Sequence, residues 1–106
     1  MYNLEFLPIA KQDIRNIAYH IFINLKNPSA ARNLVNKFIG ETQKNLLFPY
    51  GSSVYLLKEK LKYEYRIIKV NNYIMFYIID EEKKKVIIVR VLYRKMNIHN
   101  ILRNYN

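Results

Sequence analysis

Apolar and polar residues alternate along the chain first with the period of a strand and then with the period of a helix. Tyr2, Leu4 and Phe6 fall on one face of a short extended segment. Pro8 follows at a position suited to the first turn of a helix. Beyond it, apolar residues recur at spacings of three and four, which predicts one stripe of an amphipathic helix: Ile14, Ile17, Ala18, Ile21 and Leu25.

A second helix is predicted directly after the first. Asn27 is a favourable N-cap and Pro28 a favourable first helical residue. Residues 48–53 carry the proline and glycine that end a helix. Because only two or three residues join the two helices, they are expected to fold back as an antiparallel hairpin. The apolar stripe of the second helix comprises Ala31, Leu34, Val35, Phe38, Ile39 and Leu46.

The second half of the chain changes to strand-like segments. Residues 63–70, 73–79 and 86–93 are rich in β-branched and aromatic side chains, and each has the length of a strand. Asn71-Asn72 suits a tight turn because asparagine tolerates positive φ, and residues 80–85 form a polar turn. These segments predict a three-stranded antiparallel meander.

All three predicted strands are apolar on both faces near their middles, so both faces of the sheet should be covered. The helical hairpin can cover one face. The tail, residues 97–105, is a candidate short helix for the other face through Ile98, Ile101 and Leu102. One short helix cannot bury a whole sheet face, which predicts that a partner covers the remainder.

The order of elements predicts an α+β fold in two layers. It comprises an N-terminal strand, a helical hairpin, the three-stranded antiparallel meander and a short C-terminal helix, within a single domain over residues 1–106. The longest apolar run of interest has seven residues, whereas a membrane-spanning helix needs roughly 18. No signal peptide is apparent and cysteine is absent, so we expect no membrane association and a cytoplasmic location.

Charge points to an acidic or polyanionic partner. The chain has 18 Lys and Arg against 8 Asp and Glu, a net charge of +10. Residues 1–50 carry six bases and three acids, whereas residues 51–106 carry twelve bases and five acids. A coding sequence rich in A and U also favours lysine, asparagine, isoleucine and tyrosine, yet such a bias does not explain the asymmetry between the halves.

Common catalytic arrangements find little support in the sequence. His20 and His99 lie far apart without a carboxylate cluster, so no metal site is expected. Neither glycine belongs to a phosphate-binding loop, and no Ser–His or Cys–His pair suggests nucleophilic catalysis. No cofactor is predicted.

A basic set on and around the strands is the main chemical feature. Arg66 shares a predicted strand face with Glu64, Ile68 and Val70. Cations beside tyrosines are suited to phosphate contact and base stacking. Arg90 is predicted to share a face with Ile88, Leu92 and Arg94, and the remaining members are Lys58, Lys60, Lys62, Tyr93 and Lys95.

The same arginines have a structural interpretation. Arg66 could pair with Glu64 or Glu59, and Arg90 could hold the sheet to Asp13 of the first helix. A buried arginine needs such a partner. Residues 83–85, three lysines, are expected to form only a solvated turn.

Five motifs, in order between Leu4 and Leu102, resemble the RelE/ParE superfamily, the toxin halves of type II toxin–antitoxin systems. They are Asn27-Pro28-Ser29-Ala30-Ala31, Phe48-Pro49-Tyr50-Gly51, Tyr65-Arg66-Ile67, Asn72-Tyr73-Ile74-Met75-Phe76-Tyr77 and Val89-Arg90-Val91-Leu92-Tyr93-Arg94-Lys95. The resemblance implies a compact toxin with a basic sheet face and an acidic antitoxin that wraps it in a hetero-oligomer. It also implies growth inhibition and plasmid stabilisation.

Two activities are known in this superfamily. RelE-like members cut mRNA in the ribosomal A site, and ParE-like members poison DNA gyrase. For a ribonuclease, the resemblance implies charge stabilisation by Arg66 and Arg94, and proton transfer by Tyr93, His99 or Lys62. For either activity, the target- or antitoxin-binding set would be Lys58, Lys60, Lys62, Arg66, Arg90, Arg94 and Lys95.

Several positions depart from the RelE-like pattern. Ile74 stands where those enzymes carry an arginine, and Tyr93 stands where many carry a histidine. Many also end the last strand with two arginines and an aspartate, where this chain has Lys95-Met96-Asn97. The long helical hairpin is more similar to the ParE branch. We therefore expect a gyrase-directed toxin, with a ribosome-dependent mRNA endonuclease as the alternative and a non-toxic nucleic-acid-binding module as a third; whether the protein is an enzyme stays open.

Overall fold

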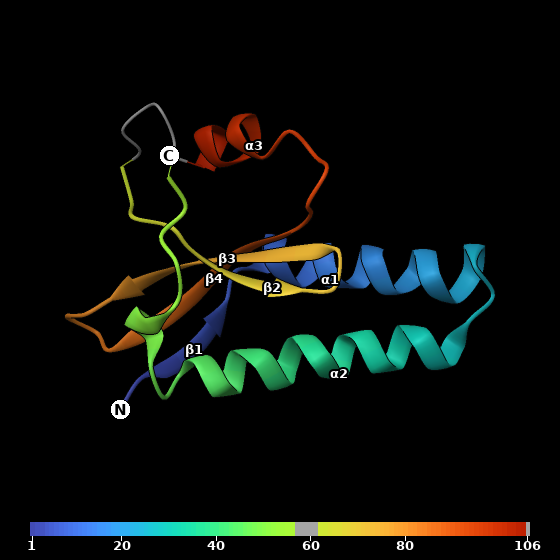
Figure 1. The fold of residues 1–106 in the computed structure, drawn as a ribbon, viewed down its shortest axis with the longest axis horizontal. Coiled ribbons are helices and arrows are strands. Elements are labelled where there is room, and N and C mark those ends of the chain that lie inside the picture. The colour runs from blue at the N-terminus through green and yellow to red at the C-terminus, as the bar shows by residue number, and fades with distance from the viewer. Residues whose placement is uncertain (57–61, 106) are drawn as a thin grey trace.

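The computed structural model describes residues 1–56 and 62–105, and its elements follow the predicted order (Figure 1). Strand β1 (Asn3–Phe6) leads into helix α1 (Pro8–Tyr19), which continues as a π-helical turn, η1 (His20–Asn24). Then come α2 (Pro28–Asn45), the 3-10 turn η2 (Pro49–Gly51), β2 (Arg66–Val70), β3 (Tyr73–Asp80), β4 (Lys85–Tyr93) and α3 (Ile98–Tyr105). The predicted α+β class is confirmed.

The four strands form one mixed sheet in the order β1-β4-β3-β2. The meander is antiparallel as predicted, whereas β1 lies parallel to β4 at the sheet edge. Asn71 adopts a φ of 53°, which is the left-handed conformation expected for the turn between β2 and β3. The pairing of β1 with β4 joins the first third of the chain to the last.

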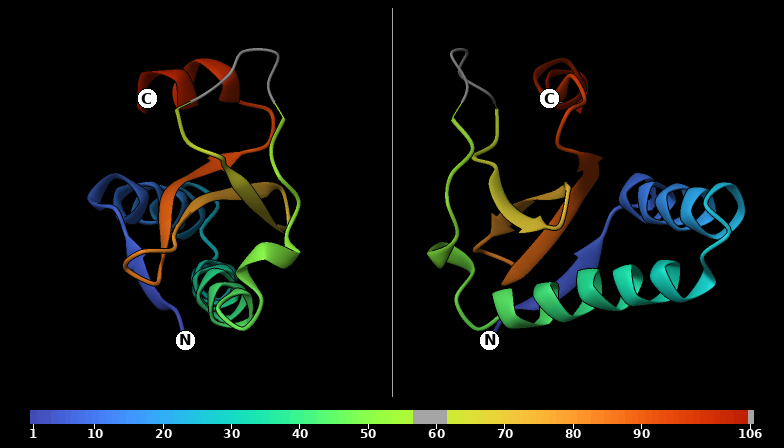
Figure 2. Two further views of the ribbon diagram at one scale, coloured as in Figure 1. Left: turned by 90° about the vertical axis from the view of Figure 1, so that its left-hand side faces the viewer. Right: turned by 45° about the vertical axis from the view of Figure 1, so that its right-hand side comes forward.

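The helical hairpin covers one face of the sheet (Figure 2). The Asn27 side chain caps α2 by accepting a hydrogen bond from the backbone N–H of Ala30 at 3.1 Å. Three members of each predicted helical stripe face this interface, and β1 adds Tyr2, Leu4 and Phe6 to its edge. The predicted stripe residues Leu25 and Ile39 are instead 60% and 49% exposed, so the stripes are confirmed only in part. The buried cluster comprises Ala10, Leu34, Phe38, Val70, Met75, Tyr77, Val86, Ile88 and Val91.

The opposite face, called the second face below, is covered in part by α3 (Figure 2). Its buried cluster comprises Tyr65, Phe76, Val89, Leu92, Ile98 and Leu102, with Ile101 partly buried beside it. The Tyr55 ring packs edge-on against Phe76 with centroids 5.1 Å apart. The predicted C-terminal helix is confirmed, and the segment around Tyr55 adds cover that the sequence pattern did not reveal.

A β-bulge changes the alternation along β4. Arg90 lies opposite Phe76, whereas Ile88 lies opposite Tyr77, so Val89 is an extra residue between them. The prediction that Arg90 shares a face with Ile88 is therefore wrong, because the extra residue shifts the two-residue period by one.

Strand β2 also begins later than predicted, at Arg66 rather than at residue 63. The backbone N–H of Tyr55 donates to the carbonyl of Tyr65 at 2.7 Å, and the N–H of Ile67 donates to the carbonyl of Ser53 at 3.1 Å. An extended segment thus lies along the start of β2.

Among the helices of the described chain, none combines the length and apolar character that crossing a bilayer requires.

Candidate functional site

Arg90 is fixed to helix α1 by a partly buried ion pair. Its Nε donates to Asp13 Oδ2 at 2.7 Å and its Nη2 donates to Oδ1 at 2.8 Å. The backbone N–H of Val91 also donates to Asp13 Oδ2, at 2.9 Å. The two charged side chains are only 20% and 12% exposed. The structural interpretation of Arg90 is thereby confirmed, and its guanidinium ties the sheet to the helical layer.

Arg66 is held in a comparable way at the start of β2. Its Nη1 donates to the carbonyl oxygens of Tyr50 and Ser52, at 3.0 and 2.7 Å. Its Nη2 lies 3.1 Å from Glu64 Oε1, which confirms the predicted pair, and its guanidinium lies over the Tyr50 ring at 5.2 Å. Arg66 thus fastens the turn η2 to the sheet.

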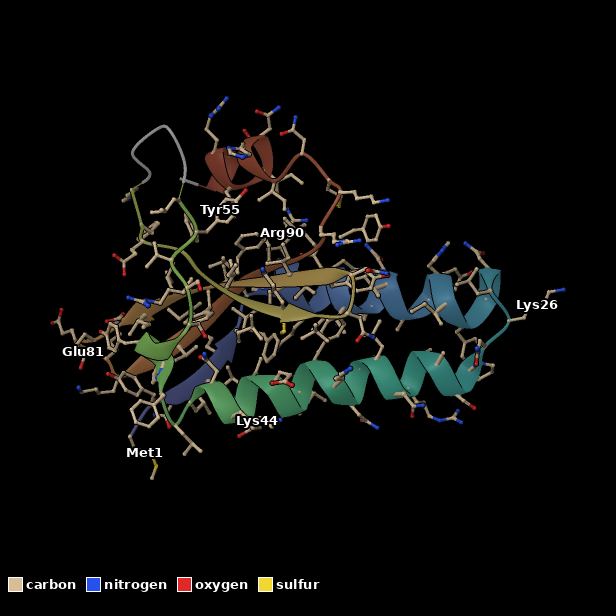
Figure 3. All side chains as sticks on the ribbon, in the orientation of Figure 1. Met1, Lys26, Lys44, Tyr55, Glu81 and Arg90 are labelled. Atoms are coloured by element: carbon tan, nitrogen blue, oxygen red, sulfur yellow. The ribbon has the colours of Figure 1, made fainter. Side chains whose placement is uncertain are left out.

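Carboxylates gather around Arg66. It shares a hollow of about 600 Å³ with Tyr50, Tyr63 and the acidic side chains of Glu64, Asp80 and Glu81. We call the region around Glu64, Asp80, Glu81 and Glu82 the acidic end; Figure 3 places Glu81 at the opposite end of the long axis from Lys26. Three cations of this region are already paired: Arg66 with Glu64, Lys84 with Glu81 and Lys85 with Glu5.

Glu81 is the centre of a polar cluster at the acidic end. The hydroxyls of Tyr2 and Tyr50 donate to its Oε2 at 2.7 and 2.6 Å, and the Lys84 ammonium donates to its Oε1. Hydrogen bonds from Lys84, Tyr2 and Tyr50 lower the pKa of Glu81 to about 2. The bond to Glu81 raises the pKa of Tyr50 to about 12 and also raises that of Tyr2.

This cluster predicts a pH-dependent contribution to stability. Because the folded-state pKa of Glu81 lies below its ordinary value, its contribution is present above pH 4.5 and is lost as the pH falls toward 2. We expect E81Q to melt at a lower temperature than the wild type at pH 7, with the difference vanishing near pH 2. E82Q is the matched control, and an equal effect of E82Q at pH 7 would contradict the assignment.

Cations without carboxylate partners lie at the other end of the strands. The backbone N–H of Arg94 donates to the carbonyl of Asn72 at 2.9 Å, so the segment after β4 rests on the turn between β2 and β3. Lys69, Arg94 and Lys95 are exposed there, and none of them forms an ion pair with another described residue. We call this region the basic end.

Two tyrosine rings adjoin the basic end. Tyr93 is 37% exposed and packs edge-on against Tyr73 with centroids 5.8 Å apart. Burial raises the pKa of Tyr73, with a smaller contribution from the charge of Tyr93. The region combines exposed cations with an accessible aromatic ring, which is suited to contact with anionic groups.

The candidate catalytic residues do not converge on one point. Arg66 lies opposite Tyr77, and Tyr93 lies opposite Tyr73. Four residues along β3 span about 13 Å. The Arg66 guanidinium is also held at Tyr50, Ser52 and Glu64, away from the basic end. His99 lies on α3, where its ring packs edge-on against Tyr55 at 5.9 Å. Tyr93, Arg94 and Lys95 are neighbours in the sequence, and the fold places them beside the turn at Asn72.

The lysines before β2 are placed in part. Lys62 is exposed, with its Nζ 5.3 Å from the centroid of the Tyr63 ring. Lys58 and Lys60 lie outside the described residues. Over residues 1–56 and 62–105, no three His, Asp or Glu side chains form a group able to hold a metal ion.

The decisive comparison concerns almost the whole chain. The family model for the ParE toxin of the parDE type II toxin–antitoxin system matches residues 4–98. The chain belongs to the ParE toxin family. The predicted membership of the RelE/ParE superfamily is thereby confirmed, and no curated protein matches the sequence significantly.

Solved structures of both branches share the fold of this ParE-family toxin. A chain of the chromosomal ParDE system from P. aeruginosa is 18% identical with a TM-score of 0.66, over 88% of this chain and 96% of that one. The isolated E. coli RelE toxin is 18% identical with a TM-score of 0.58, over 99% and 98%. A chain of the archaeal RelE–RelB complex from Pyrococcus horikoshii is 12% identical with a TM-score of 0.60, over 89% and 96%.

Sequence patterns missed two parts of this ParE-family toxin. The Glu81 cluster joins residues up to 79 positions apart, and neither Tyr2 nor Tyr50 stands in a charged motif. Tyr55 contributes to the second face from a segment that shows no strand period. The only available signal for either was the high tyrosine content, 10 of 106 residues.

Proposed function

We propose that this ParE-family toxin acts by binding a macromolecular target, with DNA gyrase as that target, rather than by cutting RNA. The separation of Arg66 from Tyr93 and Arg94 along β3 carries this proposal. RNA cleavage through the 2′-hydroxyl needs a base, an acid and a cation around one phosphate. The Arg66 guanidinium instead donates hydrogen bonds to the carbonyl oxygens of Tyr50 and Ser52 and to the Glu64 carboxylate.

The ribosome-dependent mRNA endonuclease remains the second candidate. Tyr93, Arg94 and Lys95 support it because they are exposed together at the basic end. In that case Arg94 would stabilise the scissile phosphate, and His99 or Tyr93 would transfer protons. The chain would then be an enzyme that completes its site on the ribosome.

The proposed regulator is an acidic antitoxin that covers the second face and pairs with the basic end in a cytoplasmic hetero-oligomer. Solved ParDE and RelE–RelB structures share the fold and are toxin–antitoxin systems by name, which supports such a partner. The net charge of +10 supports its acidic character. Arg94 and Lys95 are the proposed charge contacts, together with Lys62 and the undescribed Lys58 and Lys60.

Induction of the chain without its antitoxin tests the toxin assignment. We expect growth arrest, and recovery when the small acidic protein encoded beside it is produced. Apolar side chains of the second face that α3 does not fully bury are available for contact with a partner. Because high salt weakens exposed ion pairs most, a complex held by such apolar contacts should survive it after purification. Unimpaired growth at full expression would contradict the proposal, and dissociation by moderate salt alone would contradict the apolar contribution.

A further inference from the structure

Helix α2 adds a cation to the basic end through Lys37. The Lys37 Nζ donates to the side-chain oxygen of Asn71 at 2.9 Å. The backbone N–H of Arg94 donates to the carbonyl of the next residue, Asn72, also at 2.9 Å. Because consecutive Cα atoms are about 3.8 Å apart, α2 and the segment after β4 are held to one turn. Lys69 comes two residues, or about 7 Å of strand, before Asn71.

Four exposed cations therefore gather at the turn between β2 and β3. Within residues 1–56 and 62–105, none of the four has an ion-pair partner. The Asp13 carboxylate bonds to β4 nearby, at Val91, but it is already paired with Arg90. Like charges held at one turn repel each other, so a polyanionic ligand stabilises them. We call this set the basic turn: Lys37, Lys69, Arg94 and Lys95.

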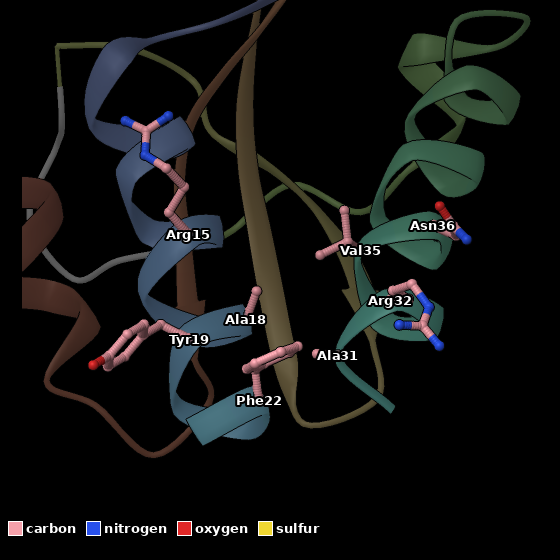
Figure 4. A pocket seen from close by; sticks show the side chains of 8 residues that line it. All are labelled: Arg15, Ala18, Tyr19, Phe22, Ala31, Arg32, Val35 and Asn36. Carbon is pink, nitrogen blue, oxygen red and sulfur yellow. The ribbon is translucent and has the colours of Figure 1, made fainter. Parts of the chain in front are cut away.

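Two arginines of the helical hairpin lie apart from the basic turn. Figure 4 shows Arg15 on α1 and Arg32 on α2 at opposite sides of a pocket of about 470 Å³. Arg32 precedes Lys37 by five residues, which is more than one helical turn toward the tip of the hairpin. The Arg15 guanidinium donates to the Gln12 side chain. These two arginines add to the net charge without belonging to the set at the turn.

The composition of the basic turn suits the backbone of a duplex. Lys69 and Asn72 are separated by three residues of extended chain, or about 10 Å. Duplex DNA carries one negative charge per about 1.7 Å of axis, so that length faces about six charges. Proteins that bind single strands present aromatic rings on which successive bases stack. Here the Tyr93 ring adjoins the cations, but it packs edge-on against Tyr73 and is only 37% exposed.

We propose that the basic turn binds the sugar–phosphate backbone of duplex DNA, independently of its sequence. The proposal deepens the proposed function and rests on it, because the DNA is the duplex that gyrase cuts. Lysine and arginine contacts to phosphate carry no sequence information, so no particular sequence is required. The acidic antitoxin, which is proposed to pair with Arg94 and Lys95, competes with DNA for these cations.

Fluorescence anisotropy of a labelled duplex of about 20 base pairs, titrated with the full chain, tests the proposal. We expect binding at low salt that weakens as the sodium chloride concentration rises. Neutralisation of four phosphates predicts a slope of about −3.6 when the logarithm of the association constant is plotted against the logarithm of the salt concentration.

Charge variants identify the cations that bind. R94E/K95E should weaken binding about tenfold or more, and K37A should make the salt slope less steep by about 0.9, the value for one phosphate contact. R32E/K83E is the matched control, because it also reverses two charges but lies outside the basic turn; it should change the affinity by about twofold or less. All the substituted side chains are exposed, and melting temperatures of the same samples report folding.

Three results would overturn the proposal: no duplex binding at about 50 mM salt, unchanged affinity of R94E/K95E, or tighter binding to a single strand or an RNA duplex of equal length. A supercoiling assay on the same proteins separates these failures from failure of the proposed function. Inhibition of gyrase without duplex binding would contradict the DNA site and leave the gyrase assignment standing. Duplex binding with the expected variant effects, but without inhibition, would support the DNA site and contradict the gyrase assignment.

Discussion

Replacing Asp13 by alanine should lower the free energy of unfolding by about 3–5 kcal/mol. The Asp13 carboxylate accepts hydrogen bonds from the Arg90 guanidinium and from the backbone N–H of Val91. Alanine would leave a largely buried cation without its partner and a strand N–H without its acceptor. Small domains have a total stability of about 5–15 kcal/mol, so denaturant unfolding should show a large shift.

Two further variants separate the ion pair from mere loss of a side chain. Removing both charges together, in D13L/R90M, should recover part of the loss because no buried charge is then left unpaired. E41A removes the exposed pair with Lys44, whose atoms lie 3.7 Å apart, and should change stability by only about 0.5 kcal/mol or less. A loss below about 1 kcal/mol for D13A would contradict the assigned role.

Removing residues 97–106 should produce a loss of similar size. Ile98 and Leu102 are buried in the second face at 6% and 0% exposure, and burial of one such side chain contributes about 1.5–3 kcal/mol. The deletion would also uncover Phe76, Val89 and Leu92. We expect a stability loss of about 3 kcal/mol or more and strong binding of a dye specific for exposed apolar surface.

Full-length variants distinguish loss of α3 packing from a general effect of truncation. L102A should reproduce much of the destabilisation, whereas N104A, which alters an exposed residue of the same helix, should have little effect. An unchanged melting temperature and unchanged dye fluorescence after the deletion would mean that α3 does not stabilise the second face.

Local patterns predicted the elements of this fold better than their pairing. The two helices, the Asn27 cap and the Asn71 turn depend on neighbouring residues, and the structure confirms all three. The parallel pairing of β1 with β4 depends on residues about 80 positions apart. The bulge at Val89 inserts one residue into a regular alternation, and an apolar strand shows no sign of it in its sequence.

Composition predicted that the site is positively charged, but not which cations stay exposed for contact with a partner. The sequence does not distinguish Arg66 and Arg90 from Arg94, because each of the three lies within or beside an apolar strand. Their partners come from distant elements: Tyr50 and Ser52 for Arg66, and Asp13 for Arg90. Only tertiary packing decides that Arg94 stays exposed at the basic end.

A gyrase assay with purified protein tests the central claim most directly. We expect the toxin to inhibit supercoiling and to accumulate gyrase-dependent DNA breaks, with R94A weakening the effect more than K83E. Toeprinting of ribosome-bound mRNA in a translation extract, with the same preparation, should show no new cleavage in the A site. Unimpaired supercoiling together with A-site cleavage that disappears in R94A would contradict the gyrase assignment and identify the chain as an endoribonuclease.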